Sequence, residues 1–249
     1  MPVHIDQQGP VAVLTLDRPE KRNAFDGALT AALDAALNAF EDEPALRVAV
    51  LTGGAQFFSA GTDVVAWAGE PTPRGGPYGI AGRRLQKPVI AAVEGIAAGG
   101  GFEIALSASM IVASRTASFS LPEVGLGLIA ECGGLFRGPR ALPLNIAREL
   151  LLTGVPLGAE RAHALGLVNR LTEPGQALSE ALALARQIAE RAPLAVRETL
   201  TALEQLNADN DERGWTLTQA AKIVARESAD AREGVAAFKE RRAPRWQGR

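Results

Sequence analysis

The chain has 249 residues, of which 47% are hydrophobic and 22% charged, and its formal net charge is −2. This composition is typical of a globular protein with a sizeable core, and the balanced charge argues against nucleic acid or a membrane surface as a partner. The single cysteine, Cys132, rules out an intrachain disulfide, and with only His4 and His163 there is no recognisable zinc constellation. We therefore expect no metal site.

The N-terminal segment lacks the basic start and apolar run of a signal peptide. The longest apolar stretch, residues 89–113, is interrupted by Glu94 and Glu103, so it is not expected to span a membrane. A lone cysteine fits a reducing compartment. These features predict a cytoplasmic protein.

Strand and helix patterns alternate over the first part of the chain. Apolar runs predict strands at residues 11–16, 47–52, 88–93, 110–113 and 117–119. Apolar residues at helical spacing predict a helix over 26–41, with Asp26 as its N-cap. This alternation favours βαβ units, and hence an α/β fold. The proline- and glycine-rich stretch 69–79 is interpreted as a mobile loop.

From about residue 143 the pattern changes to consecutive helices, and only residues 166–170 look strand-like. Helical periodicity covers residues 143–153, 175–192, 194–209, 213–227 and 229–240. The change predicts a boundary near Pro193, which divides the chain into a core domain, 1–192, and a helical C-terminal region, 193–249.

Consecutive glycines, Gly99 to Gly101, follow a predicted strand and precede a predicted helix. Glycine lets a backbone approach other groups closely, and a helix N-terminus offers unpaired N–H groups with a partial positive charge. Such a place can hold a developing oxyanion. Glu103 falls in the first turn of this helix, and Glu123 follows Pro122 in a segment that should be extended or turning. Two carboxylates beside an oxyanion cradle suit proton transfer next to a carbonyl.

Each of these features also has a purely structural explanation. The glycines could serve helix–sheet packing, Glu103 could complement the helix dipole, and Glu123 could be an exposed loop carboxylate. The joint pattern favours chemistry, because a second turning strand end lies at residues 60–62. Residues 125–130 match the dinucleotide motif G-x-G-x-x-[GA], but Pro122 interrupts the strand that the motif requires. A tight loop is therefore the favoured interpretation, and a nicotinamide-dependent dehydrogenase is the weaker alternative.

Certain stretches together carry a resemblance to a known family: Val50–Asp63, Lys87–Glu103 and Phe119–Glu123. The chain resembles an enoyl-CoA hydratase of the crotonase superfamily, and the likeness runs from Arg18 to Trp246, nearly the full length. The resemblance implies a crotonase-like ββα spiral core with a helical C-terminal trimerisation region. It also implies a homotrimer or a dimer of trimers.

The resemblance further implies the parts of an active site. The backbone N–H groups of Thr62 and Gly100 would form an oxyanion hole, while Glu103 would handle water and Glu123 the Cα proton. The substrate would be an acyl-CoA thioester that undergoes reversible syn addition of water to its 2,3 double bond. CoA would enter as part of this substrate, with no separate cofactor. Other substrate or CoA contacts are implied for Arg22, Ala24, Ala60, Gly61, Asp63, Glu131, Phe238 and Arg241.

The chain departs from the common hydratase pattern between Ala130 and Phe136, where an acidic residue, Glu131, is closer to carnitinyl-CoA dehydratases. Glu131 either meets a cationic acyl group such as a trimethylammonium or points to solvent, and we favour solvent. Thr62 replaces a common alanine, which keeps the N–H group but should crowd the pocket. Two alternatives therefore accompany the hydratase interpretation: a carnitinyl-CoA dehydratase (crotonobetainyl-CoA hydratase), or a catalytically weak acyl-CoA-binding member of the family.

The basic C-terminal end has two interpretations. Arg241 lies in a cluster of arginines and lysines that often marks a solvated helix end. The resemblance instead suggests that the last helix of one subunit approaches CoA bound to a neighbour, with Arg241 near the phosphates.

Overall fold

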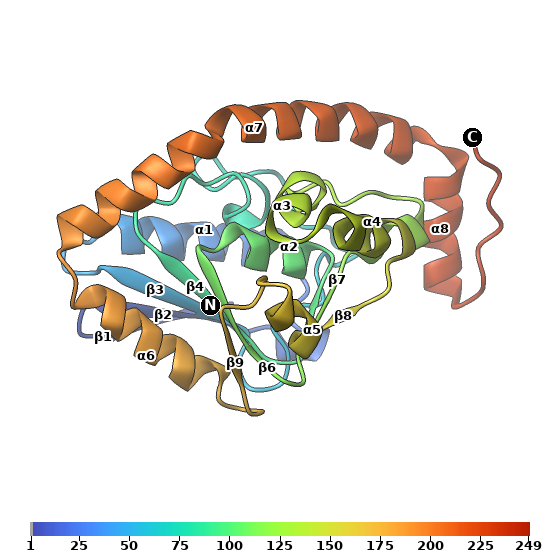
Figure 1. The fold of residues 1–249 in the computed structure, drawn as a ribbon. Helices are drawn as coiled ribbons and strands as arrows, with labels where there is room; N and C mark the ends of the chain where they lie inside the picture. Colours follow the sequence, from blue (N-terminus) through green and yellow to red (C-terminus); the bar gives the residue numbers. More distant parts are fainter. Residues whose placement is uncertain (1) are drawn as a thin grey trace.

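The computed structural model describes residues 2–249, which contain two β-sheets (Figure 1). The strands are β1 (Val3–Gln8), β2 (Val11–Leu16), β3 (Val48–Thr52), β4 (Val89–Val93), β5 (Ile96–Ala98), β6 (Met110–Ser114), β7 (Ser118–Ser120), β8 (Leu157–Gly158) and β9 (Arg170–Thr172). The larger sheet has the order β1-β2-β3-β4-β6-β9 and is parallel except at β1–β2. The smaller sheet has the order β5-β7-β8. The five strands predicted in the first part of the chain are confirmed as β2, β3, β4, β6 and β7.

Helices make up most of the remaining structure. The α-helices are α1 (Gly27–Asp42), α2 (Gly100–Ser107), α3 (Gly134–Ala141), α4 (Leu144–Thr153), α5 (Ala159–Ala164), α6 (Ala177–Ala189), α7 (Pro193–Glu227) and α8 (Ala229–Glu240). Short 3₁₀ turns are η1 (Pro19–Lys21), η2 (Pro77–Gly79) and η3 (Pro122–Leu126). Asp26 caps α1 as predicted, because its Oδ1 accepts a hydrogen bond of 2.8 Å from the N–H of Leu29.

Helices cover both faces of the larger sheet, as a mostly parallel sheet requires. On β3, Ala49 and Leu51 belong to the core on the side of α1 and α2, whereas Val48 and Val50 belong to a second core on the other side. Alanines from α6 complete this second core: Ala177, Ala181, Ala185 and Ala189. In Figure 1, α6 accordingly lies below the sheet and α1 above it.

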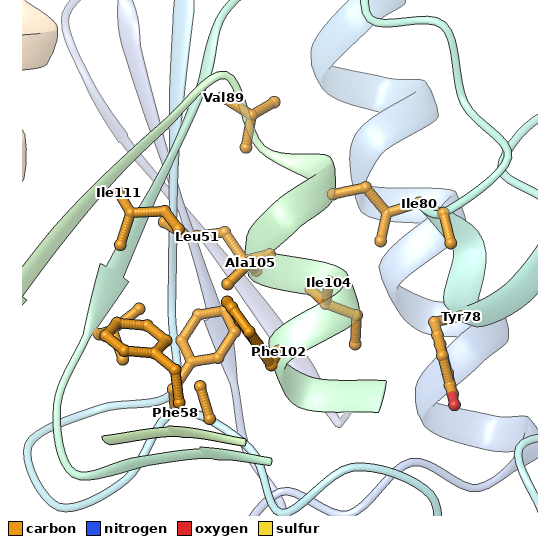
Figure 2. Close-up of a cluster of buried hydrophobic side chains, with 14 of the residues drawn as sticks. Leu51, Phe58, Tyr78, Ile80, Val89, Phe102, Ile104, Ala105 and Ile111 are labelled. Carbon is orange, nitrogen blue, oxygen red and sulfur yellow. The ribbon is translucent and has the colours of Figure 1, made fainter. Parts of the chain in front are cut away.

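Helix α2 is held at the centre of the larger core (Figure 2). Its residues Phe102, Ile104 and Ala105 are fully buried. The ring of Phe102 packs against that of Phe119 with centroids 5.2 Å apart, which ties α2 to β7. Because α2 packs so tightly, its first turn, with Glu103, has a fixed position relative to both sheets.

The two helices predicted at 194–209 and 213–227 are wrong as separate elements, because α7 runs without a break from Pro193 to Glu227. The polar stretch around Asp211 suggests an interruption, yet tertiary contacts with α3 hold it helical. Arg140 of α3 forms an ion pair with Asp211. A Cβ on Gly214 would lie 2.6 Å from the ring of Phe136, so the helices are in close contact there. Figure 1 shows α7 arching over α2, α3 and α4, with α8 descending at the right-hand side.

The stretch 69–79, interpreted as a mobile loop, is instead tied to α1. The hydroxyl of Thr72 donates a hydrogen bond of 2.8 Å to Asp34 of α1, and the backbones of Thr72 and Gly76 exchange a pair of hydrogen bonds. Next to it, the buried guanidinium of Arg83 contacts Asp34 at 2.7 Å and Glu41 at 2.6 Å. The strand predicted at 166–170 lies further along the chain, because β9 begins only at Arg170.

No α-helix within residues 2–249 is both long enough and apolar enough to cross a membrane.

Candidate active site

Glu103 lies in the first turn of α2, as the sequence predicts, and is 1% exposed. Its Oε1 accepts hydrogen bonds from the N–H groups of Cys132, at 2.7 Å, and Gly134, at 2.9 Å. These donors come from the segment that leads into α3, so two distant parts of the chain orient one carboxylate. Over residues 2–249 its other oxygen, Oε2, has no hydrogen-bond partner, which leaves this atom available to a substrate or water.

Glu123 is the second residue of the 3₁₀ turn η3, a turning segment as predicted. The fixed φ of Pro122 starts this turn directly after β7 and Leu121. The carboxylate lies next to the start of α2, since a Cβ on Gly99 would be 3.0 Å from Glu123 Oε1. Glu123 Oε2 is buried and, among the described residues, has no hydrogen-bond partner. An unpaired buried carboxylate oxygen is costly, so this group favours its protonated form.

The two carboxyls influence each other's titration. Burial raises the pKa of Glu103 to about 7, although the N–H groups of Gly134 and Cys132 oppose the shift. Burial also raises the pKa of Glu123 to about 8, and the nearby charge of Glu103 adds to this rise. Glu103 is therefore the member of the pair that ionises more readily, and Glu123 is the member that retains its proton.

Two backbone N–H groups lie beside the carboxylates. The turn containing Thr62 lies against the start of α2, because a Cβ on Gly61 would be 2.5 Å from the carbonyl of Ala98 and 3.0 Å from the nitrogen of Gly100. Phe25 bonds to both neighbours of Thr62: it donates to Gly61 at 2.7 Å and accepts from Asp63 at 2.9 Å. The amides of Thr62 and Gly100 have no acceptor of their own anywhere in residues 2–249. Unpaired N–H groups held in a fixed position can stabilise a developing oxyanion.

The carboxylates open onto a cavity of about 990 Å³. Several residues predicted from the sequence line it: Ala24, Ala60, Thr62, Asp63, Glu103, Glu123, Glu131 and Phe238. Gly61 and Gly100 are buried and do not line the cavity themselves. Arg22 and Arg241 are exposed and do not line this cavity. The volume is large enough for much of a drug-sized ligand.

Asp63 lines the cavity, but its carboxylate is already occupied. The N–H groups of Ala66 and Val65 hydrogen-bond to it and lower its pKa, and Arg18 lies 2.9 Å from Oδ2. Asp63 therefore fixes the loop that carries Thr62. Arg22 has a related role through its backbone, since its carbonyl accepts a hydrogen bond of 2.9 Å from Ala60.

The favoured expectation that Glu131 points to solvent is wrong. Its carboxylate lines the cavity and is bound by two cations of α7. Arg226 donates to both oxygens, and Lys222 lies 3.4 Å from Oε1. Arg226 also lies over the ring of Trp67, 5.4 Å from its centroid. The continuous helix α7, which the sequence did not predict, brings these cations to the cavity.

Sequence reasoning missed several lining residues, among them Tyr78 and Cys132, and the N–H of Cys132 bonds directly to Glu103. Tyr78 falls in the stretch predicted to be mobile, and the glycines on either side are the only local sign of a constrained turn. Others come from α7 and follow its helical spacing: Trp215, Thr218, Gln219 and Lys222. The sequence shows their helical periodicity, but it does not show that this face of the helix lines the cavity.

The dinucleotide motif at 125–130 is a tight loop, as favoured. Gly127 ends the turn η3 with φ 68°, and a Cβ there would lie 2.5 Å from the carbonyl of Asp230 in α8. Close packing of two backbones therefore explains this glycine. Among residues 2–249, no three side chains of His, Cys, Asp or Glu are grouped to bind a metal.

Comparisons with known proteins agree on one family. The model of the family described as "Enoyl-CoA hydratase/isomerase" matches residues 6–249. A carnitinyl-CoA dehydratase from Salmonella typhi is 42% identical over 260 residues, which cover 99% of this chain and 98% of the relative. The solved structure of a carnitinyl-CoA dehydratase from Mycobacterium avium 104 is 40% identical, with a TM-score of 0.94. That of an enoyl-CoA hydratase from Mycobacterium tuberculosis H37Rv is 43% identical, with a TM-score of 0.78. Both alignments cover 100% of this chain and 99% of the other.

Proposed function

The chain belongs to the enoyl-CoA hydratase/isomerase family and is an enzyme of the lyase type, and we propose that Glu103 and Glu123 hydrate an enoyl-CoA thioester in it. The crotonase-like α/β fold expected from the sequence is confirmed. One observation carries the proposal: two buried carboxyls lie beside two backbone N–H groups that have no acceptor within residues 2–249. These groups are suited to adding a proton to Cα and a hydroxyl to Cβ of an enoyl thioester.

Different surroundings support different roles for the two carboxyls. Glu103, ionised more readily, takes a proton from water as the water oxygen attacks Cβ. Glu123, which retains its proton, delivers that proton to Cα. Dehydration is the same sequence in reverse. CoA enters as part of the thioester, and no step calls on a resident cofactor.

The N–H groups of Thr62 and Gly100 stabilise the negative charge that develops on the thioester oxygen. They are held in place before the substrate arrives, because the turn at Gly61 and the start of α2 are packed together. Preorganised donors of this kind are worth about 3 kcal/mol each in the transition state.

The test is to add purified protein to crotonyl-CoA and follow the absorbance of the conjugated enoyl thioester. We expect the absorbance to fall and 3-hydroxybutyryl-CoA to form without any added nucleotide or metal. A protein that binds crotonyl-CoA but leaves its absorbance unchanged would instead be a catalytically weak acyl-CoA-binding member of the family.

A second candidate is the same hydro-lyase reaction on a carnitinyl thioester. The names of the relatives and the acidic Glu131 in the cavity wall favour it. However, Lys222 and Arg226 already neutralise Glu131, and Arg226 occupies the face of Trp67 that could have received a quaternary ammonium. We therefore propose a thioester with an uncharged acyl group as the preferred substrate. Comparing kcat/KM for crotonyl-CoA and crotonobetainyl-CoA decides between them, and a clear preference for the latter would reverse the order.

We also propose a homotrimer or a dimer of trimers in the cytoplasm. Exposed apolar side chains on α7 support association: Leu203, Leu206, Leu217 and Val224. Light scattering should then give three or six times the chain mass of 26.1 kDa. Arg241, exposed at the end of α8, could reach CoA on a neighbouring subunit. In that case Arg241→Ala should raise KM for the CoA thioester more than it lowers kcat.

A further inference from the structure

Tyr78 has an unusual backbone conformation for its residue type. Its φ of 56° and ψ of 9° lie in the left-handed region. Gly76 and Gly79 in the same turn also have positive φ, which glycine adopts without strain, whereas the Cβ of tyrosine makes this region unfavourable. A strained residue persists only where the contacts around it hold it there, and such residues concentrate at functional sites.

The side chain of Tyr78 supplies those contacts. It is 5% exposed, and its ring packs edge-on against Phe25, with centroids 5.4 Å apart. Its hydroxyl and the hydroxyl of Thr62 are 2.7 Å apart, so they share a hydrogen bond. Phe25 also pairs with the backbone around Thr62. Tyr78 therefore holds Thr62 directly through its hydroxyl and indirectly through Phe25.

The same hydroxyl lies against Gly100. A Cβ on Gly100 would be 2.3 Å from the Tyr78 oxygen, so this hydroxyl occupies the space that any side chain at position 100 would need. Figure 2 shows the ring of Tyr78 alongside α2, with its oxygen toward the end of the helix at which Phe102 lies. One atom thus contacts both residues whose amides are unpaired. Burial, together with Cys132 and Glu103 nearby, holds the pKa of this hydroxyl well above its usual value, so it stays protonated.

We propose that Tyr78 is a positioning residue of the oxyanion hole, whose hydroxyl anchors Thr62 and abuts Gly100 and so sets the spacing of the two amides. The inference rests on the proposed function, in which these amides stabilise the thioester oxygen. In this proposal the hydroxyl of Thr62 serves as the attachment point for Tyr78. An alanine at position 62 would keep the N–H group but would lose the anchor.

The experiment compares Tyr78→Phe, Thr62→Val and the double variant with the wild-type enzyme. Each substitution removes one hydroxyl and preserves the shape of the side chain. Thr72→Val is the matched control, because it removes a hydroxyl from the same stretch of chain that bonds to Asp34, away from the amides. Two readouts are taken: kcat and KM on crotonyl-CoA, and the absorbance maximum of bound 4-(dimethylamino)cinnamoyl-CoA. The maximum of this chromophore moves to longer wavelength when its carbonyl is polarised.

We expect Tyr78→Phe and Thr62→Val each to lower kcat roughly 10- to 100-fold, the cost of a misplaced donor, with KM within about threefold of wild type. The red shift of the bound chromophore should shrink in both. The double variant should lose no more than the worse single variant, because both substitutions break the same contact. Thr72→Val should leave kcat and the red shift close to the wild-type values.

The inference is overturned if Tyr78→Phe keeps both the wild-type kcat and the wild-type red shift. It is also overturned if the losses of the two single variants multiply in the double variant, since the hydroxyls would then act independently. Failure of the proposed function is distinguishable from either outcome. If wild-type protein leaves crotonyl-CoA unchanged while Tyr78→Phe still loses the red shift, the hydratase proposal fails and the positioning role stands.

Discussion

Glu103 and Glu123 open onto one cavity, yet their oxygens have different partners. Two backbone N–H groups bind Oε1 of Glu103, whereas Oε2 of Glu123 is buried with no partner within residues 2–249. This difference makes Glu103 the base and Glu123 the acid for hydration in the mechanism proposed above.

Replacing either carboxylate with the amide of the same size should remove most of the activity. We expect Glu103→Gln and Glu123→Gln each to lower kcat by roughly 10²- to 10⁴-fold, the usual contribution of a positioned acid or base. Binding of the CoA thioester should largely survive, because each substitution keeps the size of the side chain. Steady-state kinetics and calorimetric titration with a saturated acyl-CoA measure these two quantities. A variant that hydrates at nearly the wild-type rate would remove its residue from the pair.

The pH profile should be bell-shaped. Activity rises as Glu103 loses its proton, with a pKa of about 7, and falls as Glu123 loses its own, with a pKa of about 8. Because the two carboxyls interact, the two apparent pKa values of the profile describe the pair rather than either residue alone. The measurement is kcat/KM on crotonyl-CoA at constant ionic strength from about pH 5 to pH 10. A flat profile across this range would contradict the assignment.

The same pKa shifts predict that the folding stability of the protein depends on pH. Both carboxyls have a raised pKa in the folded protein, so the folded state binds more protons than the unfolded state between their unfolded value of 4.5 and about 8. Stability from this source is present at low pH and is lost as the pH rises through that window. Glu123→Gln removes a buried charge, so at about pH 9 its Tm should exceed that of wild type by about 2 °C or more.

The exposed Glu190 provides the control for this measurement. Glu190→Gln also removes one carboxylate but should leave Tm unchanged at both ends of the pH range. An equal rise in Tm for both variants would mean that net charge, rather than burial of Glu123, causes the effect.

A separate prediction concerns the buried ion pairs that tie residues near the loop 69–79 to α1. Arg83→Met leaves the carboxylates of Asp34 and Glu41 without their buried partner, so it should lower the free energy of unfolding by about 3–5 kcal/mol. Arg115→Met removes ion pairs that are exposed to solvent and should change stability little. Denaturant titration of both variants measures the difference. Equal effects would show that the buried arginine contributes no more than a surface one.

Much of the fold and the main catalytic hypothesis could be predicted from local patterns. Helical spacing placed α1 and its cap Asp26, and a glycine run before Glu103 marked the start of α2. These features depend on neighbours in the chain, so a sequence displays them directly. Strand β8 was missed because two residues carry no period that can be recognised, and β5 was missed because its three residues lead directly into the glycine run before α2.

Features that depend on distant contacts could not be predicted in the same way. The ion pairs of Glu131 with Lys222 and Arg226 exist because α7 continues through a polar stretch and crosses the cavity. Tyr78 is held in a left-handed conformation by Thr62 and Phe25, and no local pattern predicts a strained tyrosine. Both cases show tertiary contacts overriding local preference.

Proton exchange at Cα tests the division of roles most directly. Butyryl-CoA has no double bond to hydrate, so incubation in D₂O isolates the exchange of its Cα proton from the activation of water. Mass spectrometry should show deuterium entering butyryl-CoA with wild-type enzyme and with Glu103→Gln, but not with Glu123→Gln. Exchange that persists in Glu123→Gln and disappears in Glu103→Gln would contradict the account.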